Sequence, residues 1–171
     1  METNMFYSVG DWVVHKLYGV GQIKGVEARP IHGESLKCFR VKTKDSTFWF
    51  PIAEENNPRI RHVASEKIMD RVIKTLRRKA SYLDTDRKYW KEQIAIAQSS
   101  SDLIFISKLI RNLSTQQALR KLNQTEERAL DYFRERLLRE WAAIMRVDIS
   151  EIRRKLNAFI QESKDKLEAE A

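Results

Sequence analysis

The side chains that could bind a metal or act as nucleophiles are few and far apart. The 171-residue chain has three histidines and one cysteine, at His15, His32, His62 and Cys38. Metal sites need such ligands at short spacings, and none of these residues is paired in that way. Acidic residues such as Asp84 and Asp86 fit helix caps better than a catalytic pair. The sequence also has no nucleophile-elbow, kinase or P-loop motif. We therefore expect no enzyme activity, no metal and no cofactor.

The glycines are the second feature of the sequence that could carry chemistry, because glycine-rich loops can bind phosphate. Four of the five, Gly10, Gly19, Gly21 and Gly25, lie in the stretch VGDWVVHKLYGVGQIKGVE, residues 9–27. A phosphate-binding loop joins a strand to a helix, but no helical pattern follows GVGQIKG. Glycine is otherwise favoured where the backbone turns with positive φ or where another chain comes very close. The stretch therefore predicts a tightly wound β element whose surface could meet a partner.

Positive charge is concentrated in the middle of the chain. The net charge is +8, and residues 62–112 carry 11 basic and 6 acidic side chains. Residues 1–61 carry 9 basic and 7 acidic side chains, and residues 113–171 carry 12 and 11. A basic zone suits a phosphate backbone, although solvated helices are also rich in lysine and arginine. Charge alone leaves nucleic-acid binding open.

Composition divides the chain near residue 62. All five glycines and all three prolines precede residue 59. These residues mark turns, whereas a long stretch without them suits helices. The runs DWVVHK, GVGQIKGVEA, LKCFRVKT and TFWFPI predict four or five short strands. We predict an α+β protein with a small Tudor/SH3-like antiparallel β-barrel over residues 1–61, followed by a compact all-helical domain over residues 62–171.

Capping residues and apolar stripes divide the second domain into helices. The predicted starts are Ser65, Asp84, the serines of residues 99–102, Ser114, Asn123, and either Asp148 or Ser150. In the second helix, Trp90 lies in phase with Ile94, as a core residue does. The third helix is expected to run through Ile110, and a short fourth helix follows it. Asn123 and Glu126 have the spacing of a capping box and open the longest helix.

The first domain resembles the N-terminal module of the CarD/CdnL family of bacterial transcription regulators, which bind RNA polymerase. The pieces that carry the resemblance are VGDWVVH, YGVGQI, IHGE and FWFP, in this order. The same module occurs in the transcription-repair coupling factor. The helical half is similar to CdnL-type relatives more loosely, through DRKYWKEQIAIAQSSSD, ISKLIRNL and LNQTEERALDYFRERLLRE. The resemblance covers nearly the whole chain.

The resemblance implies that the β module docks on the β subunit of RNA polymerase, partly by edge-to-edge strand pairing. The polymerase-binding residues expected from it are Arg29, Ile31, Thr47 and Trp49. Relatives often have a basic residue at the position of Trp49, so this chain departs from the pattern there. Trp49 could anchor an interface, or it could belong to the barrel core or a domain interface.

The resemblance also implies that the helical half contacts DNA at the upstream edge of the transcription bubble. Basic residues at matching positions are Arg87, Lys88, Lys91 and Arg128. Relatives insert a tryptophan into the minor groove, but here that position falls on Asp86 or a neighbour, and a carboxylate repels phosphate. Tyr82, Tyr89 or Trp90 could substitute, and we include Trp90 among the expected DNA-binding residues, with a core role as its alternative.

These observations predict a non-enzymatic transcription regulator that binds the polymerase β subunit and promoter DNA and modulates open-complex stability. One alternative is an adaptor that binds polymerase or another partner without touching DNA. Another is a nucleic-acid-binding protein that needs no polymerase. The single cysteine and the lack of a secretory signal or a long apolar run predict a cytoplasmic bacterial protein without membrane association. We expect it to act as a monomer.

Overall fold

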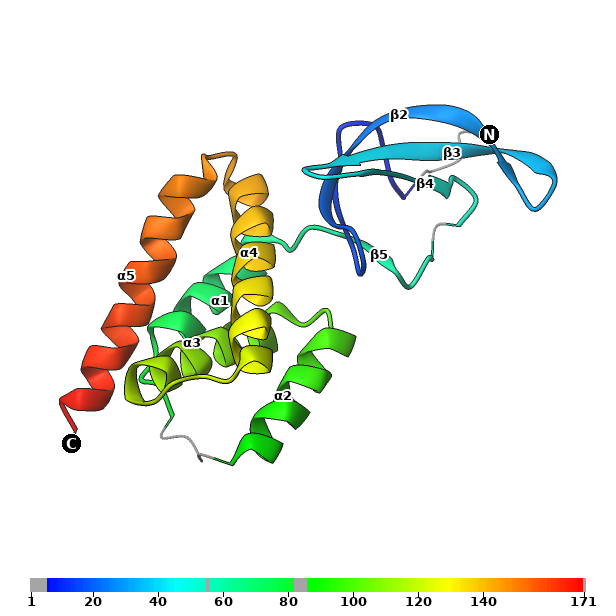
Figure 1. Ribbon diagram of the computed structural model, residues 1–171. Helices are drawn as coiled ribbons and strands as arrows, with labels where there is room; N and C mark the ends of the chain where they lie inside the picture. Colours follow the sequence, from blue (N-terminus) through cyan, green and yellow to red (C-terminus); the bar gives the residue numbers. More distant parts are fainter. Residues whose placement is uncertain (1–5, 55, 82–85, 171) are drawn as a thin grey trace. The chain divides into compact units, whose positions relative to one another are not determined.

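The computed structural model describes residues 6–54, 56–81 and 86–170. The chain forms two compact units, Met1–Val63 and Ala64–Ala171 (Figure 1). The sequence placed a boundary after residue 61. The last strand of the first unit, β5 (Ile60–His62), continues beyond that point, and the Val63 N–H donates to the Trp12 carbonyl oxygen at 3.2 Å. Backbone hydrogen bonding therefore keeps residues 62 and 63 with the sheet.

The first unit is an antiparallel sheet of five strands. They are β1 (Trp12–His15), β2 (Gly19–Ile31), β3 (Glu34–Thr43), β4 (Thr47–Pro51) and β5. Their order in the sheet is β4–β3–β2–β1–β5, and Figure 1 shows β2 and β3 as long, curved ribbons. The core of the unit consists of Tyr7, Val13, Ile23, Phe39, Val41, Phe48, Phe50 and Ile60. The predicted Tudor-like β domain, followed by a helical domain, is confirmed.

The strand register gives the sheet a core face and an outer face. In β4, Phe48 and Phe50 are buried, whereas Trp49 between them is partly exposed. The partner of Trp49 in β3 is Arg40, which is also partly exposed. Because side chains alternate between the two sides of a strand, Trp49 and Arg40 lie on the side opposite the phenylalanines. We call this side the outer face.

Gly21 lies where β2 and β3 approach each other very closely. A Cβ atom there would meet Val41 Cγ1 at 2.7 Å and the Lys42 carbonyl oxygen at 3.0 Å. Gly19, at the turn between β1 and β2, has a φ of +77°, a conformation that favours glycine. The glycine-rich stretch is thus a tightly wound β element, as its glycines indicated.

The second unit contains five described helices. They are α1 (Glu66–Arg77), α2 (Arg87–Ser99), α3 (Leu103–Leu119), α4 (Gln124–Met145) and α5 (Ile149–Glu168). Ser65 caps α1, and both hydrogen bonds of the capping box between Asn123 and Glu126 are present at α4. The N-cap of α2 is Asp86, one of the two acidic residues expected to be helix caps. Asp84 itself lies outside the described residues.

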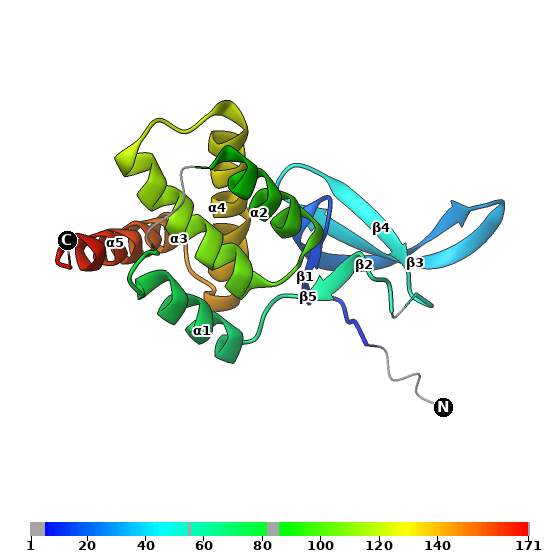
Figure 2. The same cartoon turned by 90° about the horizontal axis from the view of Figure 1, so that it is seen from below.

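The predicted third and fourth helices form one continuous helix, α3. It lies in the middle of the bundle (Figures 1 and 2) and contacts all four other helices of the unit. Its residues from Leu109 to Gln116 are buried. Ser114 was expected to start a new helix, but it lies within α3 and is buried, as is Thr115, because this central helix contacts all the other helices of the unit. Across the described residues, no helix is both long and apolar enough to cross a membrane.

We predict that Gly21→Ala destabilises the first unit by about 1–3 kcal/mol, because the added methyl group collides with β3. The check is hydrogen exchange of the β2 and β3 amides. Gly25→Ala is the matched control, because a Cβ at that position meets only Arg40 Nη2, at 3.7 Å. Equal loss of protection in both variants would contradict the close approach at Gly21.

Candidate functional site

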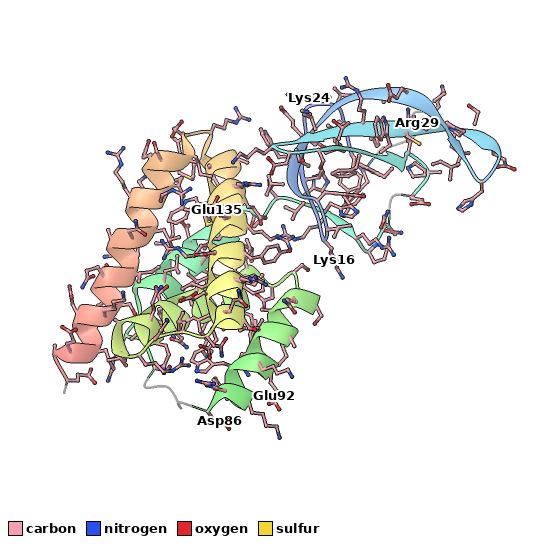
Figure 3. All side chains as sticks on the ribbon, viewed as in Figure 1. Lys16, Lys24, Arg29, Asp86, Glu92 and Glu135 are labelled. Atoms are coloured by element: carbon pink, nitrogen blue, oxygen red, sulfur yellow. The ribbon has the colours of Figure 1, made fainter. Side chains whose placement is uncertain are left out.

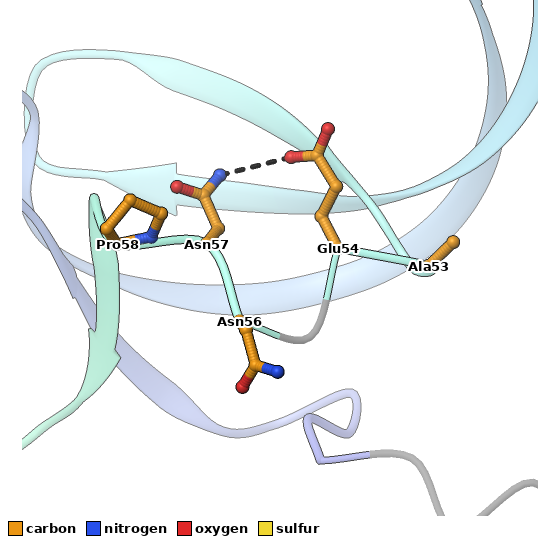
Figure 4. A pocket seen from close by; sticks show the side chains of 5 residues that line it. All are labelled: Ala53, Glu54, Asn56, Asn57 and Pro58. Carbon is orange, nitrogen blue, oxygen red and sulfur yellow. Dashed lines mark hydrogen bonds between the residues drawn. The ribbon is translucent and has the colours of Figure 1, made fainter.

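We first searched the described part of the chain for a hollow lined by polar side chains and for groups of metal-binding side chains. A shallow hollow in the loop before β5 is lined by Ala53, Glu54, Asn56, Asn57 and Pro58 (Figure 4). Its carboxylate, on Glu54, accepts a hydrogen bond from Asn57 Nδ2 at 3.2 Å. Among the described residues, no three His, Cys, Asp or Glu side chains come together in a way that could hold a metal ion. The informative features are therefore on the surfaces.

The outer face of the sheet carries a cluster of Glu27, Arg29 and Trp49. The Trp49 indole Nε1–H donates a hydrogen bond to the Glu27 carboxylate. The guanidinium of Arg29 lies over the Trp49 ring, 4.0 Å from its centroid. This cation–π contact and the hydrogen bond hold the indole in one orientation. The structure thus brings together the two residues singled out at β2 and β4, and Trp49 is not part of the barrel core.

Cys38 lies beneath this cluster in the sheet. It pairs with Glu27 in β2 and with Pro51 in β4, and it is fully buried. Burial raises the pKa of the Cys38 thiol above its ordinary value, and the positive charge of Arg29 opposes this shift. The thiol therefore stays protonated and acts as a small packing residue below the indole.

Ile31 and Thr47, the other two expected docking residues, lie on the same face. Ile31 stands two residues after Arg29 in β2, and Thr47 stands two residues before Trp49 in β4. Both are partly exposed. Since residues two apart in a strand share a face, all four residues border one continuous surface.

β4 lies at one end of the described sheet and has a free edge. At its start, the Thr43 N–H donates to the Ser46 carbonyl oxygen at 2.9 Å, which fixes the phase of the β3–β4 ladder. In an antiparallel pair, hydrogen-bonded residues alternate with residues whose N–H and C=O point away from the partner. The main-chain groups of Thr47 and Trp49 therefore point outward from the edge. An added strand would find main-chain donors and acceptors at this edge, while the Trp49 indole lies over the outer face, directed toward Glu27 and Arg29 of β2.

The basic residues expected to contact DNA lie at the start of α2 and the start of α4. Arg87, Lys88 and Lys91 are exposed on α2, and Arg128 is exposed on α4. The two helices contact each other. The positive charge of Arg87 contributes to lowering the pKa of Glu126, which lies in the first turn of α4. Figure 3 marks Asp86 at the first end of α2 and Glu92 farther along it. The fold thus places three of the four cations on α2 and one on α4, and Arg87 lies near the first turn of α4.

An ion pair between the partly exposed Arg120 and the buried Glu126 fixes the loop that leads into α4. Arg120 binds the Glu126 carboxylate through two hydrogen bonds, both of 2.9 Å, and Glu126 is 1% exposed. The Asn123 N–H also donates to this carboxylate, at 2.9 Å. Hydrogen bonding from Arg120 is the main reason that the pKa of Glu126 lies below its ordinary value, although burial opposes the shift. The sequence indicated the capping box, but it did not indicate Arg120, whose role depends on the path of the loop.

Trp90 is a core residue in this structure. It is 1% exposed and packs in the helical core with Ile94 and Ala97, which is the alternative that its phase in α2 indicated. It therefore presents no surface to a DNA groove, and its inclusion among the DNA-binding residues does not fit its burial. Asp86 cannot take that role either, because its carboxylate accepts the Lys88 N–H at 2.9 Å as the N-cap. Tyr89, which is 39% exposed, is the accessible aromatic of this helix, and Tyr82 lies outside the described residues.

The fold defines a class of protein: a small Tudor-like β module followed by a helical domain. Residues 7–64 match the family model of the CarD-like/TRCF RID domain. The chain therefore contains a domain of this family, which confirms the resemblance to CarD/CdnL proteins and to the module of the transcription-repair coupling factor. It is a transcription-related protein that interacts with RNA polymerase. Domains of this family are in general not enzymes.

We predict that Trp90→Ala destabilises the helical unit by about 3–5 kcal/mol, because the substitution leaves a large cavity in its core. Trp49→Ala, on the outer face of the sheet, is the contrasting variant and should cost much less. Thermal unfolding of both variants checks this. A near-neutral Trp90 variant would show that the indole does not support the core.

We predict that the stabilisation provided by Glu126 depends on pH. Its pKa is lowered in the folded chain, so its contribution is complete above the ordinary value of 4.5 and decreases as pH falls below it. Glu126→Gln should therefore be less stable than wild type at about pH 7, and the difference should shrink toward about pH 3. Urea unfolding of the two proteins across this range measures it. A difference that stays constant with pH would contradict the ion pair.

Proposed function

We propose that this protein docks on the RNA polymerase β subunit through its sheet and contacts promoter DNA at the upstream edge of the bubble through its helical unit. It acts in the cytoplasm of a bacterium and changes the stability of the open complex. The observation that carries the proposal is the free β4 edge of a polymerase-interacting domain, with Trp49 held in place by Arg29 and Glu27. A fixed aromatic beside unpaired main-chain groups is suited to strand addition.

The basic surface at α2 and α4 supports the DNA contact. Exposed Arg87, Lys88, Lys91 and Arg128 suit phosphate oxygens, which position a protein on DNA without reading its sequence. Docking on polymerase raises the local concentration of DNA around this surface, so weak phosphate contacts suffice. If the surface fits opened DNA better than closed DNA, binding shifts the equilibrium toward the open complex.

An adaptor that binds polymerase without touching DNA is the second candidate. It is favoured by Asp86, at the expected wedge position, which is used as a helix cap, and by Trp90, a possible substitute for the wedge, which is buried. Without an intercalating side chain, the helical unit would have only surface charges to hold DNA. The two candidates differ in one measurable property, the dependence of DNA association on salt, because phosphate contacts release counterions.

The test is the lifetime of promoter open complexes formed by RNA polymerase of the same organism, with and without the protein. We expect wild type to change the lifetime and Arg29→Glu to abolish the effect, because the reversed charge cannot stack on Trp49. The triple variant Arg87→Gln, Lys88→Gln, Lys91→Gln should retain polymerase binding, lose most of the lifetime effect and show a smaller salt slope in DNA binding.

The matched control is the triple variant Lys67→Gln, Arg71→Gln, Lys74→Gln, which removes three exposed charges from α1. It should behave as wild type. If wild type binds polymerase but leaves the lifetime unchanged, the DNA role is refuted and the adaptor is correct. If wild type does not bind polymerase, the docking role is refuted as well.

A further inference from the structure

The end of α1 carries several cations, and they differ in whether a carboxylate compensates them. The run RRKAS covers the last residue of α1 and the four residues after it. Arg77 pairs with Glu162 of α5 at 2.8 Å, and Lys79 pairs with Glu170 just beyond α5. Arg78, between them, has no carboxylate within ion-pair distance among the described residues. The charge of Arg78 is therefore left without a counter-charge.

Among the described residues, Arg111 of α3 is a second cation without a carboxylate partner. It is 4% exposed. Its Nη1 donates to the Thr75 carbonyl oxygen at 2.9 Å, and the Arg78 backbone N–H donates to the same oxygen at 3.3 Å. Burial lowers the pKa of Arg111 below its ordinary value, and the positive charge of Arg78 lowers it further. Two charges that repel each other thus lie at the end of α1, so an anion placed there would be attracted by both.

Ser81 lies next to these two arginines. Its N–H donates to Asn112 Oδ1 at 3.4 Å, and Arg111 Nε donates to the same oxygen at 2.9 Å. Arg111 Nη2 has no hydrogen-bond partner within the described part of the chain. Ser81 is exposed, so an enzyme can reach its hydroxyl group. A small acidic group attached to Ser81 Oγ would therefore begin close to the Arg111 guanidinium.

We infer that Ser81 is a site of phosphorylation and that Arg78 and Arg111 bind the phosphate group attached to it. The phosphoryl donor is a nucleoside triphosphate, and the catalyst is a protein kinase that recognises basic residues before the serine. Ser81 Oγ forms a bond to the γ-phosphorus, and the bond from that phosphorus to the oxygen bridging it to the β-phosphate breaks. The nucleoside diphosphate leaves with the electron pair, and the hydroxyl proton passes to a base of the kinase.

The phosphate supplies the negative charge that the two arginines lack. It carries about −1.5 to −2 charges at pH 7 and three acceptor oxygens, which suit guanidinium groups. A phosphate of the DNA backbone is a poorer ligand, because Arg111 is almost fully buried and a nucleic-acid strand is too bulky to approach it. A phosphate carried by the neighbouring Ser81 needs to move only a short distance.

Phosphorylation at this position also affects the surface proposed to contact DNA, and this consequence rests on the proposed function. Asn112, which accepts the Ser81 N–H, lines a small pocket together with Trp90 of α2. Ser81 therefore lies close to the helix that carries three of the four cations proposed to bind DNA. A dianion beside this helix repels the phosphates of DNA, so phosphorylation should weaken the contact.

The first test compares the full-length protein with and without phosphoserine incorporated at Ser81 through an expanded genetic code. We expect the phosphorylated protein to unfold at a higher temperature. The second pKa of its phosphate, measured by phosphorus NMR, should lie at or below about 5.5 rather than near its ordinary value of about 6. Arg78→Gln should reverse most of both changes. Arg71→Gln is the matched control, because Arg71 is an exposed cation two turns earlier on α1, and it should reverse neither.

A phosphate pKa near its ordinary value that does not respond to Arg78→Gln would refute the binding of phosphate by these arginines. Since Arg78 is exposed, its substitution tests the site even if the buried Arg111 tolerates no change. The modification itself is tested by mass spectrometry of the protein isolated from its own organism during growth and during starvation. Phosphate on Ser81 in either condition supports the inference, and its absence in both overturns it.

The effect on DNA is measured separately, by the affinity of the phosphorylated and unmodified proteins for promoter DNA at ~0.1 M salt. We expect phosphorylation to weaken binding about threefold to tenfold. Equal affinities would refute this consequence while leaving the phosphate site in place. If the unmodified protein does not bind DNA, the proposed DNA contact has failed, and the pKa and unfolding results still decide whether Arg78 and Arg111 bind the phosphate.

Discussion

The register between β2, β3 and β4 is the constraint on which both the core of the first unit and its candidate docking surface depend. Side chains alternate along each strand, so a slip of one residue would move Trp49 into the core and expose Phe48 and Phe50. The close approach at Gly21, where a Cβ would lie 2.7 Å from Val41 Cγ1, ties β2 to one position on β3. The irregularity between Ile23 and Gly25 then adjusts the alternation so that Glu27 and Arg29 share a face with Trp49.

In the helical unit, the ion pair between Arg120 and the buried Glu126 constrains the geometry as the strand register does in the sheet. Ion pairs that are removed from water add little net stability, because desolvation offsets much of their attraction, but the loss of one partner is costly. Arg120 and Glu126 therefore matter chiefly for geometry. Their two hydrogen bonds and the capping box at Asn123 fix where α4 begins. Because Arg87 lies near the same carboxylate, the position of this loop also determines how the cations of α2 and α4 are grouped.

The sequence predicted the features that depend on neighbouring residues. Composition located the change from sheet to helices, and the caps at Ser65 and Asn123 were correct because a cap involves residues only three apart. Features that depend on distant contacts were not predictable. Trp49 binds Glu27 across 22 positions of sequence, and nothing local indicated that partner. Ser114 suggested the start of a separate helix, whereas burial against the other helices keeps α3 continuous. Asp84 and Asp86 are both good caps, and sequence alone could not decide between them.

The two positions at which the sequence departs from the pattern expected from its resemblance to CarD/CdnL proteins both have local structural roles. Trp49 replaces a residue that is often basic, and it is held by Arg29 and Glu27. Asp86 stands near the expected wedge, and it caps α2. Each of these two residues therefore takes on a structural role at the position where it departs from the pattern. The fold is preserved while the chemistry on its surface is rearranged, since a fold positions side chains but does not dictate which of them make contacts. At the sheet, the rearrangement places an aromatic residue on the edge strand, and its indole reaches across β3 to Glu27 and Arg29 of β2.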